Sequence, residues 1–178
     1  MDSINRQQEE ENRKDISNME AIDKIRELID EAKTCFFCTR ASLSGPLSTR
    51  PMSVQQVDEE GVIWFLSAND SHKNAEIKVD PTVQMFFQGS DHSDFLTLTG
   101  TASITTNKAK IQALWQPILK TWFTEGVDDP RITVIAVTPE NGYYWDNKNG
   151  NMIAYIKQLA GAAMGKTMDD SIEGERRL

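Results

Sequence analysis

Three consecutive polar residues, Ser71, His72 and Lys73, have the types and spacing of an anion-binding turn. They follow a run that is predicted to be a strand, residues 62–66, and they open a short helical pattern that ends before a proline. The first turn of a helix carries unpaired N–H groups and lies at the positive end of the helix dipole, so it favours a phosphate. Arg50, at the start of the preceding predicted strand, could supply a second cation. These residues therefore predict a phosphate-binding site.

Each of these residues also has a simpler interpretation. Ser71 suits the N-cap position of the helix, which contributes about 1 kcal/mol, and this role is compatible with phosphate binding. Arg50 could instead pair with one of the many acidic residues of the chain, although an exposed pair contributes only about 0–1 kcal/mol. His72 is interpreted as a solvated residue at the helix start rather than as a catalytic base.

The elements that must position these residues are short strands and a few helices. Six strands are predicted, at residues 34–43, 49–57, 62–67, 82–89, 94–106 and 131–137, and residues 142–145 extend a strand after Pro139. Helices are predicted at residues 17–33, 71–79, 107–123 and 152–163. Pro117 should break or kink the third helix. Because most strands are joined by short turns, we expect an α+β fold in which six antiparallel strands curl into a small barrel with flanking helices, since closure removes exposed strand edges.

Composition limits the domain count and the classes of partner. The 178 residues suit one domain, residues 17–165, between a mobile polar tail, residues 1–16, and a second polar tail, residues 166–178. A net charge of −8 argues against nucleic acid as a partner. No apolar run approaches the roughly 20 residues of a membrane span, so we expect a soluble protein in the cytoplasm.

The two cysteines, Cys35 and Cys38, form a C-x-x-C pattern. The surrounding aromatic and β-favouring residues predict a strand, in which positions i and i+3 point to opposite faces. We therefore expect buried, reduced thiols rather than a redox pair. Two cysteines and two distant histidines also make a poor zinc site, so no metal is predicted.

Several short segments occur along the chain in a distinctive order. They are RPM at residues 50–52, VIWFLS at 62–67, SHK at 71–73, DP at 80–81, LTGTA at 98–102, LW at 114–115, KTWF at 120–123, DDP at 128–130 and YWD at 144–146. In this order they resemble the flavin-binding split barrels of the pyridoxamine 5′-phosphate oxidase-like superfamily, and within it the bacterial general stress proteins. The resemblance extends over about residues 17–165.

The resemblance implies a homodimer of six-stranded antiparallel split β-barrels with two FMN sites at the subunit interface; FAD would fit instead if the pocket is open beyond the phosphate. The residues implied to surround the phosphate are Arg50, Ser71, His72 and Lys73. The residues whose backbone is implied to border the ring and the ribityl chain are Met52, Ser53, Val54, Phe65, Leu66 and Ser67. The residues implied to reach the flavin of the other subunit are Phe95 and Trp145.

The sequence departs from the oxidase of this family at several positions. A lysine, an arginine and a glutamine of the oxidase correspond here to Gln55, His72 and Phe95, and residues 173–178 do not resemble its substrate-binding arginine motif. The resemblance therefore supports a flavin but not the oxidation of pyridoxamine 5′-phosphate.

Three functions remain open. The first is a flavin-dependent oxidoreductase, connected to stress, that acts on an unidentified small molecule and has reduced pyridine nucleotide as a candidate electron donor. The second is a protein that binds, buffers or senses flavin without turnover. The third is a structural dimer that has lost its flavin site, and the presence of Arg50, Ser71 and Lys73 speaks against it. No catalytic residue can be assigned from the sequence, because any redox chemistry would be that of the flavin.

Overall fold

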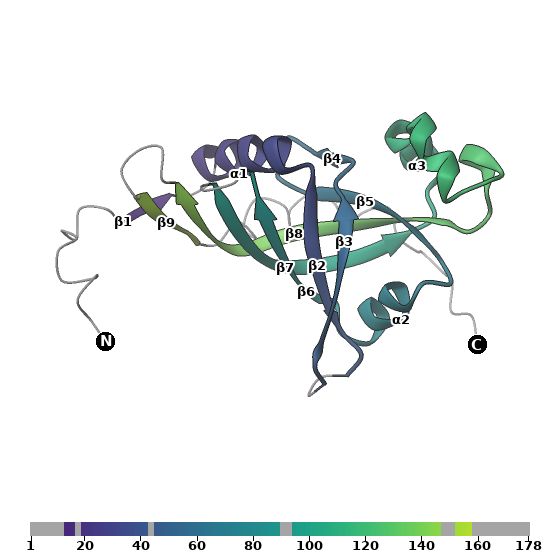
Figure 1. Cartoon of the computed structure of the whole chain (residues 1–178), viewed down its shortest axis with the longest axis horizontal. Helices are drawn as coiled ribbons and strands as arrows, with labels where there is room; N and C mark the ends of the chain where they lie inside the picture. Colours follow the sequence, from purple (N-terminus) through teal and green to yellow (C-terminus); the bar gives the residue numbers. More distant parts are fainter. Residues whose placement is uncertain (1–12, 17–18, 43–44, 90–93, 147–151, 158–178) are drawn as a thin grey trace, which may run out of the picture.

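The structure is a computed structural model that describes residues 13–16, 19–42, 45–89, 94–146 and 152–157 (Figure 1). Its strands are β1 Arg13–Ile16, β2 Thr34–Arg40, β3 Leu47–Ser53, β4 Gln56–Val57, β5 Ile63–Ala68, β6 Thr82–Gln88, β7 Phe95–Thr105, β8 Ile132–Asp146 and β9 Met152–Lys157. Its helices are α1 Met19–Ala32, α2 His72–Val79 and α3 Lys108–Leu114, with the 3₁₀ turns η3 Pro117–Thr121 and η4 Gly126–Asp128. Strands and helices thus form an α+β fold, as expected.

The nine strands of the described residues belong to one sheet. Seven of them follow the order β1-β9-β8-β7-β6-β2-β3, whereas β5 pairs with β8, and β4 pairs with β5. The pairs are antiparallel except for β1 and β9, which are parallel. Because the chain passes from β3 into β4, which pairs with β5, the sheet curls back on itself as a partly open barrel (Figure 1).

The prediction of six strands is wrong, for two physical reasons. The predicted strand at residues 49–57 is interrupted: Val54 donates its N–H to Lys33 and Gln55 donates to Trp64, so β3 ends and β4 begins as a separate short strand. In addition, β1 and β9 extend the sheet beyond the barrel. The predicted strand at residues 131–137 and its extension at residues 142–145 form the single long strand β8, whose register against β7 shifts between Thr99 and Gly100.

The helix predicted at residues 152–163 is also wrong where the structure describes it. Met152–Lys157 form β9, which pairs antiparallel with the last part of β8. A short apolar run is compatible with either a helix or a buried strand, and its periodicity alone does not separate the two. Residues 152–157 form a strand because the last part of β8 has an edge with unpaired backbone N–H and C=O groups, with which these residues can pair. The remainder of that predicted helix and the C-terminal tail lie outside the described residues.

The strand β1 lies in the segment that the sequence predicts to be a mobile tail. Its residues Arg13–Ile16 pair with residues 153–156 of β9. The polar composition of this segment gives no signal for a strand, so the pairing depends on β9 being in place.

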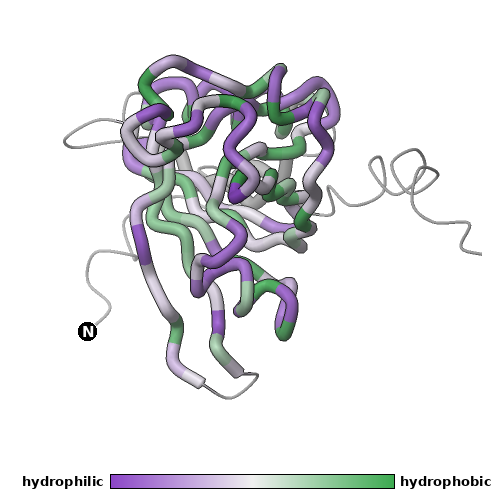
Figure 2. The backbone as a smooth tube through the Cα atoms, turned by 90° about the vertical axis from the view of Figure 1, so that its right-hand side faces the viewer, coloured by the Kyte–Doolittle hydropathy of each residue, from purple (hydrophilic) through white to green (hydrophobic). Residues whose placement is uncertain are grey.

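Apolar side chains fill the inside of the curled sheet, and α1 covers one end of it. Figure 2 shows hydrophobic stretches running along the strands. The centre of the core holds Phe37 and Phe65, whose rings are 5.2 Å apart and nearly perpendicular. Ile25, Leu28 and Ile29 of α1 are almost completely buried against this core. Burial of each such side chain contributes roughly 1.5–3 kcal/mol.

A second, smaller core lies under α3 and η3. The predicted break at Pro117 is confirmed, because α3 ends at Leu114 and η3 begins at Pro117. Leu119 and Phe123 turn inward from this region, whereas Trp122 remains 62% exposed. None of the described helices is long and apolar enough to cross a membrane.

The cysteine prediction is confirmed: Cys35 and Cys38 on β2 are both buried and unpaired. Burial is the main cause that raises the pKa of the Cys35 thiol to about 12, and the nearby Cys38 is the second cause. The Sγ atom of Cys38 lies 3.3 Å from the hydroxyl oxygen of Thr49 on β3.

Candidate functional site

Helix α2 begins at the turn that the sequence singled out. Ser71 is its N-cap, with an extended backbone, and its hydroxyl accepts a hydrogen bond from the N–H of Asn74 at 3.4 Å. The helix ends at Val79, because Asp80 precedes Pro81. The predicted N-cap role of Ser71 is therefore confirmed.

A buried polar network fixes this helix start to the sheet. The side-chain oxygen of Asn74 accepts hydrogen bonds from Ser67 at 2.9 Å and from Ser71 at 3.2 Å. The amide nitrogen of Asn74 donates to the hydroxyl of Thr133 at 2.8 Å, and this hydroxyl donates to the carbonyl of Ser67 at 3.0 Å. Asn74 is only 1% exposed. One side chain thus joins β5, α2 and β8.

Arg50 extends from β3 towards α2 and forms an ion pair with Glu76. The distance from Nη2 of Arg50 to Oε2 of Glu76 is 2.9 Å, and the two side chains are 22% and 12% exposed. Nη1 of Arg50 donates to the hydroxyl of Thr39 on β2, and that hydroxyl donates to the same carboxylate oxygen of Glu76. The alternative in which Arg50 pairs with an acidic residue is therefore confirmed, although the pair is mostly buried rather than exposed.

Lys73 lies on the first turn of α2 and is half-buried. Within the described ranges its ammonium group has no hydrogen bond or ion pair. Burial lowers its pKa, and so does the positive charge of Arg50, while Asp70 and Glu76 act in the opposite direction. An anion that lies between the two cations would relieve their repulsion. Beside Lys73, His72 is exposed, as predicted.

The donors at this point of the fold fit a phosphate group. Two cations come from different elements, β3 and α2, and the hydroxyls of Ser67 and Ser71 lie 3.1 Å apart at the helix start. Only two of the five N–H donors of an arginine are used by Arg50 in the contacts above. Charge, free donors and the helix dipole thus coincide at one place.

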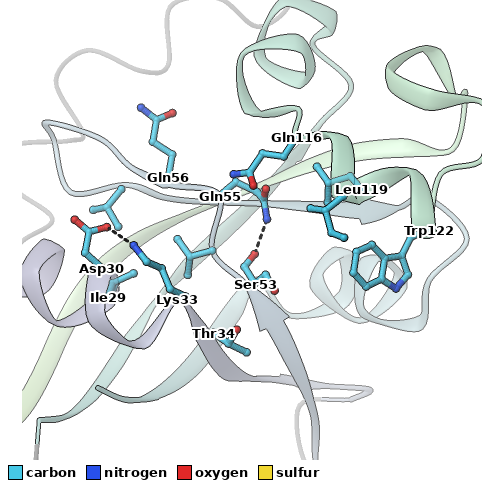
Figure 3. A pocket seen from close by; sticks show the side chains of 13 residues that line it. Ile29, Asp30, Lys33, Thr34, Ser53, Gln55, Gln56, Gln116, Leu119 and Trp122 are labelled. Atoms are coloured by element: carbon cyan, nitrogen blue, oxygen red, sulfur yellow. Dashed lines mark hydrogen bonds and ion pairs between the residues drawn. The ribbon is translucent and has the colours of Figure 1, made fainter. Parts of the chain in front are cut away.

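A cavity of about 470 Å³ lies at the end of β3, the strand that carries Arg50 (Figure 3). Its lining residues come from α1, the β3–β4 connection and η3; they are Ile29, Asp30, Lys33, Thr34, Ser53, Val54, Gln55, Gln56, Val57, Gln116, Ile118, Leu119 and Trp122. Lys33 and Asp30 neutralise each other at 3.7 Å, and Gln55 donates to the carbonyl of Ser53 at 3.1 Å. Aliphatic side chains, three glutamine amides and one exposed indole thus form most of the lining. A lining of this kind suits an uncharged planar ring with polar edges.

The structure brings together only part of the predicted set. Ser53 and Val54 line the cavity, while Met52 is half-buried against the core. The side chains of Phe65 and Leu66 are buried in the first and the second core, and neither residue lines the cavity. The prediction for these two residues concerns their backbone, and it stays a prediction. Their strand, β5, instead carries Ser67 to the helix start.

Phe95 and Trp145 lie elsewhere, directly opposite each other on β7 and β8. They are 40% and 42% exposed on the outer face of the sheet. Phe95 lines a second cavity, of about 350 Å³, together with Phe36, Pro51 and Phe86. Within this chain, the exposed aromatic residues and the phosphate-site residues therefore form separate groups.

Several residues of the site were missed in the sequence. Thr39, Glu76, Asn74 and Thr133 were not predicted, and Trp122, which lines the cavity, was not among the predicted flavin contacts. One signal was available: Asn74 is three positions before the apolar Ile77 and so lies on the same helix face, where a polar residue needs a partner. No three His, Cys, Asp or Glu side chains of the described residues are grouped so that they could hold a metal ion.

Comparison with known proteins gives consistent matches. Residues 20–169 match the sequence family described as pyridoxamine 5′-phosphate oxidase like. Protein bli-3 of Neurospora crassa is 28% identical over 155 residues, which cover 82% of this chain and 74% of that protein.

Two solved structures are similar in fold. The general stress FMN/FAD binding protein from Xanthomonas citri has a TM-score of 0.63 and 23% identity, covering 73% of this chain and 91% of that chain. General stress protein 26 from Bacillus anthracis has a TM-score of 0.61 and 23% identity, covering 71% of this chain and 94% of that chain.

Proposed function

Because this chain belongs to the pyridoxamine 5′-phosphate oxidase-like family, we propose that it binds FMN, with Arg50 and Lys73 as the charged contacts of the phosphate. The observation that carries the proposal is the convergence of these two cations at the capped start of α2. Lys73 has no direct partner among the described residues, and Arg50 raises the local positive charge. The similar Xanthomonas citri protein, an FMN/FAD binding protein, supports the choice of a flavin.

The geometry of β3 supports the position of the ring. Ser53 is three residues after Arg50, and a strand rises about 3.3 Å per residue, so the cavity begins roughly 10 Å from the phosphate site. A phosphorylated five-carbon ribityl chain spans a distance of the same order. FMN can therefore lie along β3, with its phosphate near Arg50 and its ring beside Ser53, Val54 and Trp122. FAD is the alternative if the site is open beyond the phosphate.

We also propose a homodimer, with the outer face of the sheet as its interface. Phe36 and Phe86 lie directly opposite each other, and so do Phe95 and Trp145. All four aromatic side chains are 39–59% exposed on one face. An exposed apolar patch of this kind is typical of an interaction surface. A second copy of the chain would cover it and bring Phe95 and Trp145 towards the flavin of its partner.

The proposed activity is that of a flavin-dependent oxidoreductase with a small-molecule substrate, acting in the cytoplasm. A bound flavin would supply the electron or hydride transfer, while residues of this chain bind its phosphate, orient its ring and shield it from water. The general stress proteins of similar fold support a role under stress. The second candidate is flavin binding, buffering or sensing without turnover, and it is favoured by the lack of an acid–base group on the cavity wall apart from the paired Asp30 and Lys33.

The proposal is tested by purifying the full chain, recording its visible spectrum and titrating it with FMN and riboflavin. Flavin absorbance and tighter binding of FMN than of riboflavin are expected. Equal affinity for both would contradict the phosphate site. Reduction of the FMN-loaded protein by reduced pyridine nucleotide, followed by reoxidation with candidate acceptors, then separates the two functions, because only an oxidoreductase turns over repeatedly.

A further inference from the structure

Glu76 is the one carboxylate in direct contact with the phosphate-site cations among the described residues. It lies on α2, three positions after Lys73, and its side chain is only 12% exposed. Its Oε2 atom accepts hydrogen bonds from Arg50 and from Thr39, which is itself completely buried. The carboxylate is thus built into the site rather than attached at its surface.

The hydrogen bonds keep this carboxylate ionised at neutral pH. Burial raises the pKa of Glu76, but hydrogen bonds from Thr39, Arg50 and Ser48, together with the charge of Arg50, outweigh burial and hold the pKa below its ordinary value. The charged groups that act on Lys73 are Arg50, Asp70 and Glu76. The site therefore combines the two cations Arg50 and Lys73 with a permanent negative charge.

This negative charge acts against the ligand that the cations attract. A phosphate monoester carries about −1.5 to −2 at pH 7. A carboxylate on Arg50 therefore repels a phosphate on the same guanidinium, and the low exposure of the pair weakens screening by solvent. Glu76 also helps to hold Arg50 in place, which favours binding. Thr39 provides a second contact with the guanidinium, so we expect the repulsion to be the larger of the two effects.

Given the flavin phosphate site proposed above, on which this step depends, we infer that Glu76 is a specificity-determining residue that weakens binding of phosphate monoesters and so makes the flavin exchangeable. The carboxylate of Glu76 lowers the preference for FMN over riboflavin. It does so at the phosphate, because Glu76 is not among the residues that line the cavity proposed for the ring. Such a residue would allow bound FMN to dissociate when the concentration of free FMN falls. This behaviour suits a protein that responds to the concentration of flavin.

The test compares the wild-type chain with Glu76→Gln, which keeps the shape and an oxygen acceptor but removes the charge. Dissociation constants for FMN and riboflavin are measured by the change of flavin fluorescence, and the FMN dissociation rate by stopped flow. We expect Glu76→Gln to bind FMN about tenfold more tightly and to release it correspondingly more slowly, with riboflavin affinity changed less than about twofold. Inorganic phosphate should also compete with FMN more strongly in the variant.

Two further variants make the result specific. Glu59→Gln removes one charge from an exposed residue of the 58–61 turn and should leave the FMN-to-riboflavin ratio unchanged. Glu76→Ala should shift the ratio in the same direction as Glu76→Gln, but less, because Arg50 loses a partner; it also serves if Glu76→Gln does not fold. Circular dichroism verifies folding of each variant.

The outcomes distinguish this inference from the proposed function. The ratio in question is the affinity for FMN divided by the affinity for riboflavin. If the wild-type chain prefers FMN but this ratio is unchanged or lower in both Glu76 variants, the inference is wrong and the phosphate site is not affected. An equal gain in Glu59→Gln also overturns it, because net charge would then explain the effect. A wild-type chain without preference for FMN overturns the phosphate site and the inference together.

Discussion

Arg50 on β3 and Glu76 on α2 form a mostly buried ion pair, with 2.9 Å between Nη2 and Oε2. The pair joins the strand that leads to the ring-sized cavity with the helix that carries Lys73. It therefore fixes the relative position of the two cations, and it adds a negative charge beside them. In the proposed phosphate site, this one contact would link the stability of the fold to the affinity for the ligand.

Lys73→Ala should weaken FMN binding by about tenfold to a hundredfold, because a charge-assisted hydrogen bond contributes roughly 1.5–3 kcal/mol. Riboflavin affinity should stay the same. Lys78→Ala is the matched control, since Lys78 is exposed in the last turn of the same helix. Fluorescence titration of the three proteins checks this, and a similar loss in Lys78→Ala would argue against a specific role for Lys73.

Phe86→Lys should convert the proposed dimer to monomers, because it places a charge in the middle of the exposed aromatic face. Val79→Lys, at a side chain that is 61% exposed on α2, should leave the dimer intact. Light scattering at micromolar concentration should give about twice the 20.1 kDa chain mass for the wild type. A flavin-loaded wild-type protein of the monomer mass would refute the dimer.

Asn74→Ala should lower the free energy of unfolding by about 1–3 kcal/mol, because the buried hydroxyl groups of Ser67 and Thr133 each lose their hydrogen bond with the Asn74 amide. Asn69→Ala is the control: Asn69 is exposed and its amide makes only a long contact of 3.5 Å to the carbonyl of Pro130, so a change within about 0.5 kcal/mol is expected. Urea unfolding measures both, and equal effects would show that the network does not matter.

Stability should fall as the pH rises from 9 to 12, in part through Cys35. Burial raises the pKa of this thiol from 9.0 to about 12, so within this window the unfolded chain loses the proton while the folded chain keeps it. The unfolded state then binds fewer protons, and the free energy of unfolding decreases with pH. Cys35→Ala should show a shallower decrease over the same window in chemical unfolding. Parallel curves for the two proteins would assign the pH dependence to other groups.

Pyridoxamine 5′-phosphate should not be oxidised at a useful rate by the FMN-loaded protein. The phosphate of this substrate is a second anion beside the phosphate of FMN, and residues 173–178 lack the arginine motif that would bind it. The net charge of −8 adds an unfavourable field. Peroxide production measures the reaction, with an authentic pyridoxamine 5′-phosphate oxidase as the positive control. Turnover comparable with that enzyme would show that this prediction is wrong.

Local signals in the sequence predicted much of the fold. The capping residue Ser71, the proline after Asp80 and the break at Pro117 each act on neighbours within a few residues, and the structure confirms all three. The periodicity of residues 19–32 likewise predicted α1, since an amphipathic helix needs only an apolar surface to cover. The α+β class followed from the mixture of such elements.

The contacts between residues that are far apart in the chain could not be predicted from the sequence and are known only from the tertiary structure. Glu76 was one of many acidic residues until the curled sheet brought it to Arg50, which is 26 positions away in the chain. The partner of Asn74 on β8 is 59 positions away, and residues 152–157 form a strand because the edge of β8 is next to them. The sequence by itself determined the local elements and the residue types at the helix start, because caps, prolines and periodicity act over one or two turns. Only the tertiary structure decided which charges meet there, because strand register sets the position of side chains that are far apart in the chain.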